Sequence, residues 1–505
     1  MRSIASRWRA GIKRAPFFGF AAALCACAAL ATKLPRYGGV LRIELREAAL
    51  SPDPREWKPG TPEFASNEKL AALIFDRLVS LDEYGRFLPQ LAVEWSHDPA
   101  FQRWVFKLRG GVTFSDGSAL SGAEAEAALR PLLPAGMRAS SSGMTLTLQS
   151  AAAAPDMLEQ LASGRYFIFH DAGDGRLAGT GAFILTEASH SRTDGKPSFY
   201  TLQANNSCWA GRPFLDRVEI TAGLPALKRL LDLELGQADV IELAPELVRR
   251  ARQEDLRVWT SDPVTLFGLR LPDGDGAEQA RLREAISLSL DRVTMAGVLL
   301  QRQAQPAAAL LPEWLSGYAS LFSIEPDSES ERELRGTPKL SSAAAGEPML
   351  LRVDAPGELA KLLGDRVALN ARQKGINLQI AGKNQQTHLA PAAPAEVRLF
   401  VWRFTLLSAP AELAELQASL RVGDSAEPGG AKGELQQLYA KERKLLEDRR
   451  VAPLVLLPEY IGLSANIRDW MPARWGAWRL ADAWLDTPAV SSAPPSETPS
   501  RTQRE

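Results

Sequence analysis

Two short stretches of this chain alternate apolar and polar residues, and a tight-turn signal follows each of them. The stretches are 79–82 and 104–108, and the turn signals are the segments 82–85 and 116–117. A period of two is that of a half-buried strand, and Asp-Gly steps and their relatives close tight turns. This part of the chain is therefore expected to form short strands of a twisted antiparallel sheet.

The order of particular residues in this block says more than the alternation does. It reads Pro89-x-Leu91-Ala92-x-x-Trp95, and then Phe106-x-Leu108-Arg109-x-Gly111-Val112-x-Phe114-x-Asp116-Gly117. The block resembles the signature of the family 5 extracellular solute-binding proteins, which serve ABC importers of peptides, nickel and oligosaccharides. The resemblance implies that the chain captures a solute outside the membrane and catalyses no reaction.

Three later segments are also similar to this family. The segment 179–183 resembles Gly-Thr-Gly-Pro-Tyr/Phe, with Ala182 in place of Pro, and its glycines are expected to adopt backbone angles that other residues avoid. The segment 205–216 resembles Asn-Pro-x-Tyr-Trp-x-Gly-x-Pro-x-Leu-Asp, with departures at Asn206 and Cys208. The segment 283–292 resembles the family's Arg-x-Ala-x-x-x-Ala-x-Asp-Arg helix.

Local signals predict several further elements. Ser121 with Glu124 predicts the start of a helix over 119–133, and Gly236 predicts the end of a helix over 225–235. The other expected elements are a strand at 38–45, a helix at 63–77, a strand at 144–148, a helix at 278–292, a strand–helix–strand unit over 350–380, a helix at 434–449 and a buried strand at 453–458. The segments 323–348 and 486–505 are rich in Ser and Pro and are expected to be an exposed loop and a disordered tail.

The resemblance implies an α/β fold of the type II periplasmic-binding-protein class, with two large lobes, a hinge and an extra small domain. A length of 505 residues also exceeds what one hydrophobic core usually supports. The expected parts are a leader at 1–31, a discontinuous lobe I at 37–60, 179–270 and 460–487, a small accessory domain at 61–178, a lobe II at 271–459 and the tail at 486–505.

The N-terminus carries an export signal. Five basic residues precede an apolar run over 15–31 that ends in Ala29-Leu30-Ala31, the small-x-small pattern of a secretory cleavage site. Cleavage after Ala31 is one outcome, lipidation of Cys27 in Leu24-Cys25-Ala26-Cys27 is a second, and an uncleaved anchor is a third. All three place the body of the protein in the periplasm or another extracytoplasmic space, and cleavage would change the formal net charge from −1 to −6.

Catalytic and metal-binding patterns are missing from the sequence. The four histidines have no metal-ligand spacing, and there is no Gly-x-Ser-x-Gly elbow. Cys208 is the one cysteine beyond the leader, and it is expected to be a small buried residue. The chain is therefore predicted not to be an enzyme, to use no cofactor and no metal, and, having no basic run, to bind no nucleic acid.

The segment 396–405 holds the best ligand-binding candidates, which are Trp402, Arg403 and Thr405. Peptide binders of the family have Gly-Trp-x-x-Asp here, with the Trp on the cleft wall and the Asp on the ligand's free amine. Thr405 replaces that Asp, and a neutral hydroxyl makes no charge-assisted bond to an ammonium group. Glu412 and Glu415 are possible substitutes, but both are expected to face solvent on a helix.

The expected function is that of the solute-binding component of an ABC importer. It would act as a monomer, hold a peptide-like or other small solute between its lobes, and deliver it to a membrane permease. The alternative is a degenerate binding-protein fold that acts as a receptor or protein-interaction module without transport. A secreted hydrolase is a third option, but no group of residues supports it.

Overall fold

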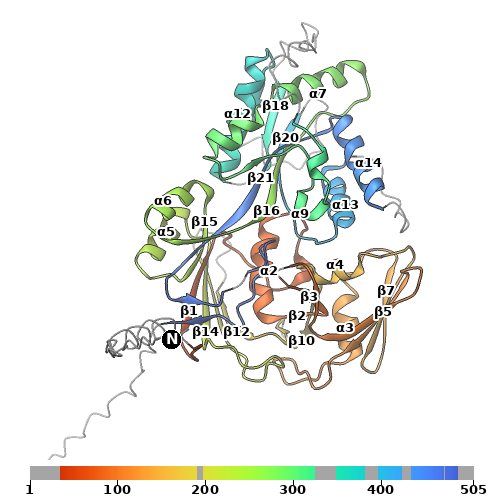
Figure 1. Cartoon of the computed structure of the whole chain (residues 1–505), viewed down its shortest axis with the longest axis vertical. Coiled ribbons are helices and arrows are strands. Elements are labelled where there is room, and N and C mark those ends of the chain that lie inside the picture. The colour runs from red at the N-terminus through yellow and green to blue at the C-terminus, as the bar shows by residue number, and fades with distance from the viewer. Residues whose placement is uncertain are drawn as a thin grey trace, which may run out of the picture. The chain divides into compact units, whose positions relative to one another are not determined.

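A computed structural model describes residues 34–82, 84–173, 175–189, 197–324, 349–355, 357–381, 396–422, 434–470 and 472–486. Within these ranges the largest sheet has eleven strands, in the order β12-β13-β14-β1-β15-β21-β16-β20-β18-β19, with β17 paired to β21 (Figure 1). Its strands are β1 Val40–Leu45, β12 Phe183–Ser189, β13 Ser198–Ala204, β14 Arg217–Ala222, β15 Val240–Leu243, β16 Arg257–Arg270, β17 Gln305–Pro306, β18 Met349–Val353, β19 Leu378–Ile380, β20 Val397–Arg403 and β21 Val451–Leu463.

Two long strands, β16 and β21, hold the two halves of this sheet together. The end of β21 pairs with β15 and with the start of β16, whereas the other half of β16 pairs with β20. Their mutual register is irregular on both sides of Pro263, which lies opposite Pro458. Because proline has no N–H to donate, the ladder is weakest at this point, midway along both strands.

The β1 half of the sheet is covered by helices from neighbouring segments. These are α2 Pro62–Ile74, α5 Ala226–Glu234 and α6 Val248–Gln253. The Gly236 residue after α5 has a φ of +69°, so it ends the helix in the left-handed conformation, as predicted. Parallel pairing of β1 with both β14 and β15 places this strand inside the sheet.

A separate four-stranded antiparallel sheet confirms the prediction from the alternating block. It consists of β5 Ala92–His97, β6 Arg103–Leu108, β8 Thr145–Ser150 and β7 Met137–Ser142, in that order. Helix α3 (Gly122–Leu129) packs beside it, and the Ser121 hydroxyl accepts a hydrogen bond from the Glu124 N–H at 3.3 Å, as the sequence predicted. Near it lies the hairpin of β3 Val79–Leu81 and β4 Phe87–Pro89.

The β18 half of the sheet contains the predicted strand–helix–strand unit. Helix α12 (Glu358–Gln373) connects β18 to β19, and these two strands are parallel. The helices α7 Ala277–Ser289, α13 Ala409–Leu420 and α14 Glu434–Glu447 lie in the same region of Figure 1.

The remaining elements are short. They are η1 Pro54–Glu56, β2 Asp76–Arg77, α4 Met157–Ala162, β9 Phe167–Ile168, β10 His170–Asp171, β11 Leu177–Ala178, η2 Pro245–Leu247, α8 Arg292–Thr294, η3 Met295–Leu299, α9 Glu313–Ser316, η4 Ala319–Leu321, β22 Ile467–Arg468 and β23 Trp484–Leu485.

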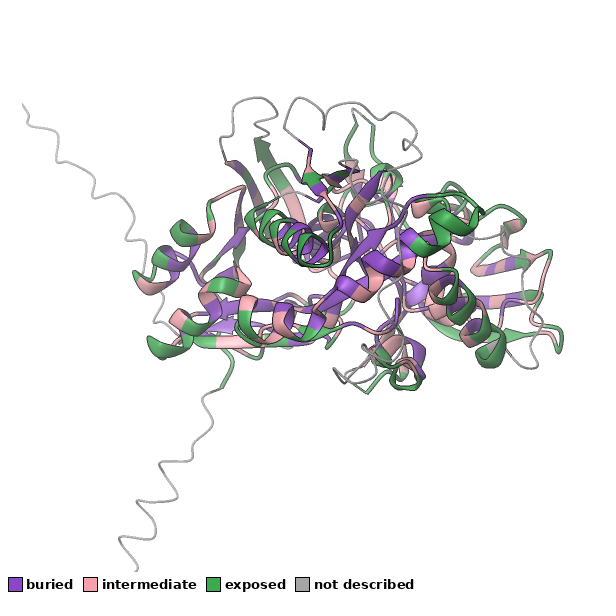
Figure 2. Cartoon of the chain, turned by 90° about the horizontal axis from the view of Figure 1, so that it is seen from above, coloured by how far each residue is buried: buried purple, intermediate pink, exposed green. Residues whose placement is uncertain are grey.

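Buried residues follow the strands, and exposed residues lie on the outer faces of the helices (Figure 2). One apolar cluster joins β1, α2, the four-stranded sheet and the chain around Trp470 and Trp478. Separate clusters lie under α12 and α7, around Trp402 with α13, and under α5 and α6. No helix within the described ranges is long and apolar enough to span a bilayer.

The glycines of the 179–183 segment serve a different purpose from the one predicted. Neither Gly179 nor Gly181 has a positive φ. Instead, a Cβ at Gly179 would lie 2.0 Å from the Ile74 carbonyl oxygen, and the Gly181 N–H donates to that same oxygen at 2.9 Å. The motif therefore lets two backbones approach closely where α2 ends.

Other predictions need smaller corrections. The helix expected over 63–77 ends at Ile74, because Asp76 and Arg77 form β2. Cys208 is only partly buried. The leader with Cys27 lies outside the described residues, as do the tail from 487 and all but the first two residues of the 323–348 loop.

A buried carboxyl group on β1 gives a prediction about pH. Burial, and next the hydrogen bond with Asp232, raise the pKa of Glu44 to about 8, while one of its oxygens has no hydrogen-bond partner in the part of the chain that the structure describes. Since the folded pKa exceeds the unfolded one, the wild type loses stability as the pH rises from about 4.5 to about 8. We expect Glu44→Gln to unfold like the wild type at pH 5 but to be more stable by about 1–3 kcal/mol at pH 8.5, as measured by urea denaturation. Equal behaviour of the two proteins at both pH values would contradict this account.

Candidate functional site

The carboxylate of Glu412 organises the chain that follows β20. Its Oε1 accepts a hydrogen bond from the Trp402 indole N–H at 2.6 Å, and its Oε2 accepts from the N–H groups of Thr405 at 3.1 Å and Leu406 at 2.6 Å. Glu412 lies in the first turn of α13, whose start is capped by the Ser408 hydroxyl. Burial raises the pKa of Glu412 to about 7, and its three donors act in the opposite direction. The prediction that Glu412 faces solvent is wrong, because this residue is 0% exposed.

Trp402 lies against the loop that leads into α2. A Cβ at Gly60 would lie 2.2 Å from the Trp402 ring, and Gly60 has a φ of +78°. The Gly60 carbonyl also accepts a hydrogen bond from the Arg403 N–H at 2.8 Å. The indole is therefore fixed on one edge by Glu412 and on its face by Gly60, and it is 3% exposed.

The chain after Trp402 also contacts the segment around α4. The Leu407 N–H donates to the Ser163 hydroxyl at 3.0 Å, and the Ser408 hydroxyl bonds to Asp156. Glu415, which was predicted to face solvent, has a half-exposed side chain and pairs with Arg165 at 3.3 Å. The segment 402–415 is thus held from the loop at Gly60 on one side and from the α4 segment on the other.

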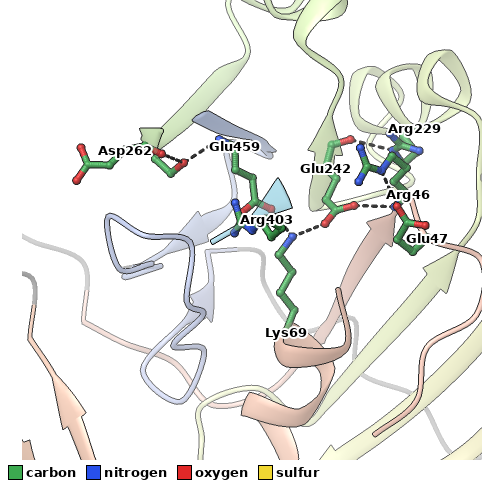
Figure 3. Close-up of polar contacts among 9 residues, drawn as sticks. Arg46, Glu47, Lys69, Arg229, Glu242, Asp262, Arg403 and Glu459 are labelled. Atoms are coloured by element: carbon green, nitrogen blue, oxygen red, sulfur yellow. Dashed lines mark hydrogen bonds and ion pairs between the residues drawn. The ribbon is translucent and has the colours of Figure 1, made fainter. Parts of the chain in front are cut away.

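A charged network lies beside this segment (Figure 3). Lys69 extends from α2, and its ammonium group pairs with Glu242 of β15 and Glu459 of β21. Glu459 also pairs with Arg403 of β20 at 3.1 Å, and Glu242 accepts a hydrogen bond from the Arg46 backbone N–H at 2.7 Å. Four elements that are far apart in the sequence therefore meet at one buried lysine, which is 3% exposed.

The electrostatics of this network favour its ionised form. Burial alone would raise the pKa of Glu242, but the Lys69 ammonium and then the Arg46 guanidinium outweigh it, so this pKa falls to about 2. The charges of Glu242 and Glu459 likewise outweigh the burial of Lys69 and raise the pKa of its ammonium group.

The chain between Trp470 and Trp478 covers the network. The Lys69 ammonium lies 5.4 Å from the centroid of the Trp478 ring, and a Cβ at Gly476 would lie 2.7 Å from Arg403 Nη2 and Glu459 Oε2. Trp259, Trp470 and Trp478 pack edge to face, with successive ring centroids 5.9 Å apart. The network is thus covered by the Trp478 ring and by a backbone that leaves no space for a side chain at Gly476.

The three predicted ligand-binding residues lie together here but differ in their surroundings. Trp402 and Arg403 have partners within the chain, whereas the Thr405 hydroxyl is buried and has no hydrogen-bond partner among the described residues. Lys69, Glu242 and Glu459 were not predicted from the sequence. One signal was available for Lys69, since it lies four residues before Leu73 and so on the apolar face predicted for that helix.

The described part of the chain has no group of three or more His, Cys, Asp or Glu side chains placed to hold a metal ion. The charged network contains two carboxylates, but a lysine already lies between them. The arrangement can therefore offer hydrogen bonds and aromatic faces to a bound molecule, with its charges paired internally.

Comparison with known proteins identifies the fold. Residues 86–334 match the model of the bacterial extracellular solute-binding proteins, family 5. No curated protein matches the sequence. Solved structures match along nearly their whole length. The Escherichia coli murein tripeptide-binding protein MppA has a TM-score of 0.72 and 15% identity, covering 90% of this chain and 99% of MppA.

Two further structures give the same result. NikA from Brucella suis in complex with Fe(III)-EDTA has a TM-score of 0.72 and 18% identity, covering 88% of this chain and 99% of NikA. The substrate-binding protein CtaP from Listeria monocytogenes has a TM-score of 0.71 and 14% identity, covering 90% of this chain and 100% of CtaP. The resemblance and the α/β binding-protein fold predicted from the sequence are confirmed.

Proposed function

This chain is a divergent member of the family 5 bacterial extracellular solute-binding proteins, and we propose that it captures a small solute between two lobes and delivers it to an ABC permease. Lobe I would comprise 37–60, 179–270 and 460–487, lobe II would comprise 271–459, and 61–178 would form the accessory domain. The observation that carries the proposal is the contact of Trp402 and Arg403 with Gly60, beside the two long strands that join the halves of the sheet. The irregular pairing at Pro263 and Pro458 is a natural hinge for opening this contact.

Each of the three candidate residues has its own role in this proposal. The Thr405 hydroxyl would bond to the solute, because it is a buried polar group without a partner among the described residues and such groups are rare in folded proteins. Trp402 would form the wall of the site, with its position fixed by Glu412. Arg403 would face the solute while its charge is balanced by Glu459.

Proteins of this family are extracytoplasmic, and we propose that the leader places this one there as well. Cleavage after Ala31, lipidation at Cys27 and retention as an anchor predict different products, which are a mature start at Thr32, an acylated Cys27 and an intact N-terminus. Intact-mass measurement of the soluble and membrane fractions separates them. Full-length protein in the cytoplasm would contradict all three.

The test of solute capture is native mass spectrometry of protein purified from the periplasm of its own host. We expect a bound molecule of defined mass that is lost on denaturation. Thr405→Val should raise the dissociation constant of this molecule about 5-fold and so lower its occupancy, as the loss of about 1 kcal/mol of hydrogen bonding implies. Ser96→Val, on an exposed strand of the four-stranded sheet, is the matched control and should leave the occupancy unchanged. A protein that carries no molecule, and gains no stability from solutes of its native medium, would contradict solute capture.

We also expect peptides with a free amino group to bind weakly. Thr405 supplies no charge for a buried ammonium group, and losing such a partner costs about 2–5 kcal/mol. Isothermal titration calorimetry should give no submicromolar binding for simple dipeptides and tripeptides, and N-acetylation of the same peptides should change little. Tight binding of the free amine with loss on acetylation would show that another carboxylate takes the role of the family's Asp.

The alternative function, a receptor or protein-interaction module without transport, is favoured by one observation. The Trp402 indole already donates to Glu412, and Glu459 already pairs with both Lys69 and Arg403, so few groups remain for a solute. Native mass spectrometry separates the two functions, because a module of this kind would carry a protein partner and no small molecule.

A further inference from the structure

We propose that Lys69 is a specificity-determining residue whose ammonium group occupies a cation site formed by Glu242 and Glu459, so that the chain itself takes the place of a primary-amine ligand. The inference rests on the proposed function for its biological meaning, because Lys69 would exclude amines from the site where a solute would bind. Its physical content is independent of that function. A site for a primary ammonium ion should appear when the Lys69 side chain is removed.

The two carboxylates are held in place without the lysine. Glu242 Oε2 accepts from the Arg46 backbone N–H at 2.7 Å, which leaves Oε1 for the ammonium group. Glu459 Oε2 lies 3.1 Å from Arg403 Nη2, and its backbone N–H donates to the Ser261 hydroxyl at 2.7 Å, which again leaves Oε1 for the ammonium group. Each carboxylate thus presents one oxygen to Lys69 and is fixed through other atoms, so the site should survive the loss of the side chain.

The surroundings suit an alkylammonium ion in both charge and shape. The Arg46 guanidinium pairs with Glu47, and Arg403 pairs with Glu459. Lys69 is the cation that pairs with both Glu242 and Glu459 (Figure 3). The Trp478 ring, 5.4 Å from the ammonium nitrogen, adds a cation–π contact. Beyond Cβ the lysine side chain is three carbons and a nitrogen, so n-propylammonium has the size and charge of what Lys69→Ala removes.

If Lys69 formed only a structural ion pair, replacing it would lower the stability and an added amine would not restore it. If Lys69 occupies a cation site, an added amine should restore part of the lost stability. A ligand that binds only the folded protein raises its melting temperature by mass action. We expect Lys69→Ala to melt well below the wild type. At ten times its dissociation constant, n-propylammonium should raise the melting temperature of the variant by about 1–3 °C at constant ionic strength, with no effect on the wild type.

Four controls make the result specific. Propan-1-ol has the same shape without the charge, and tetramethylammonium has the charge without N–H donors, so neither should rescue Lys69→Ala. Lys69→Met fills the space with a neutral chain and should not respond to n-propylammonium. Lys107→Ala removes an exposed lysine of β6 and should melt and respond like the wild type.

Rescue by n-propylammonium alone, and only in Lys69→Ala, supports the proposal. Equal effects of n-propylammonium and propan-1-ol, or a folded Lys69→Ala that ignores both, would overturn it. If Lys69→Ala does not fold, the same comparison is made with Lys69→Ser and with refolding yield as the readout, where the amine but not the alcohol must restore folding. A wild-type protein without a co-purified solute would count against solute capture but would not affect the rescue of Lys69→Ala. Failure of the proposed function and failure of the cation-site proposal can therefore be distinguished.

Discussion

Replacement of Glu412 by Ala is expected to lower the free energy of unfolding by about 3–5 kcal/mol. The side chain is 0% exposed and accepts three hydrogen bonds, from the Trp402 indole and from the N–H groups of Thr405 and Leu406. Each buried donor left without a partner costs about 1–3 kcal/mol, and shared relaxation keeps the total below the sum. Urea denaturation followed by tryptophan fluorescence measures the effect, and it also reports on the released Trp402 ring.

Two variants test the explanation. Glu415→Ala removes a half-exposed carboxylate from the same helix and should cost no more than about 1 kcal/mol. Glu412→Gln keeps a carbonyl acceptor of the same size and should recover part of the loss. A loss in Glu412→Ala that is no larger than in Glu415→Ala would refute the role of Glu412 in fixing this segment.

The pH dependence of Glu412 has a defined sign. Its folded pKa of about 7 is above its unfolded value, so the folded protein binds the proton more tightly. Its contribution to stability is therefore greatest below about pH 4.5 and is lost as the pH rises through about 7. Glu412→Gln does not titrate and should lack this slope between pH 5 and pH 8, when both proteins are compared by urea denaturation.

The elements that the sequence predicted correctly are those set by neighbouring residues. The Ser121 cap acts through the N–H of Glu124, three residues away, and Gly236 ends α5 through its own left-handed backbone. The strand–helix–strand unit over 350–380 needs only two strand patterns and one helix between them. Local chemistry decides such features, so one sequence is enough to predict them.

The charged network could not be predicted in the same way. Lys69 meets partners 173 and 390 residues away, and each of these residues alone has the composition of an ordinary surface charge. Glu412 was predicted to face solvent because most helical glutamates do, but the Trp402 indole and two N–H groups of the turn after Trp402 donate to its carboxylate. Buried charges depend on tertiary partners, and no local pattern identifies those partners.

The structural role of Gly179 and Gly181 could not be predicted either, because it also depends on a partner that is distant in the sequence. A Gly-x-Gly pair is compatible with unusual backbone angles and with close packing. Here the constraint is close packing against the Ile74 carbonyl, which belongs to a helix about a hundred residues earlier in the sequence. The recognised motif was right about the family and gave no information on which of the two constraints applied.

Gly60→Val is expected to be as severe as the loss of Glu412, at about 3–5 kcal/mol, and to separate Trp402 from the loop before α2. Gly60 has a φ of +78°, which costs a β-branched residue about 1–3 kcal/mol. Its new Cβ would also lie 2.2 Å from the face of the Trp402 ring, and Glu412 holds the N–H edge of that ring, so the ring cannot move away without losing its hydrogen bond. Crowding of this kind costs a further 1–3 kcal/mol or so.

Gly85→Val provides the matched control, because Gly85 has the same φ of +78° and no atom of the described residues lies within 4 Å of its new Cβ. The difference in unfolding free energy between the two variants therefore isolates the contact with Trp402. Adding Trp402→Ala should cost less in the Gly60→Val background than in the wild type, since the clash is then already relieved. Small-angle X-ray scattering should show a larger radius of gyration for Gly60→Val alone, because Gly60 and Trp402 belong to different proposed lobes and their contact would join them. Equal losses for Gly60→Val and Gly85→Val, with additive effects of Trp402→Ala, would mean that Trp402 does not press on this loop in solution, and the proposed wall of the solute site would have to be placed elsewhere.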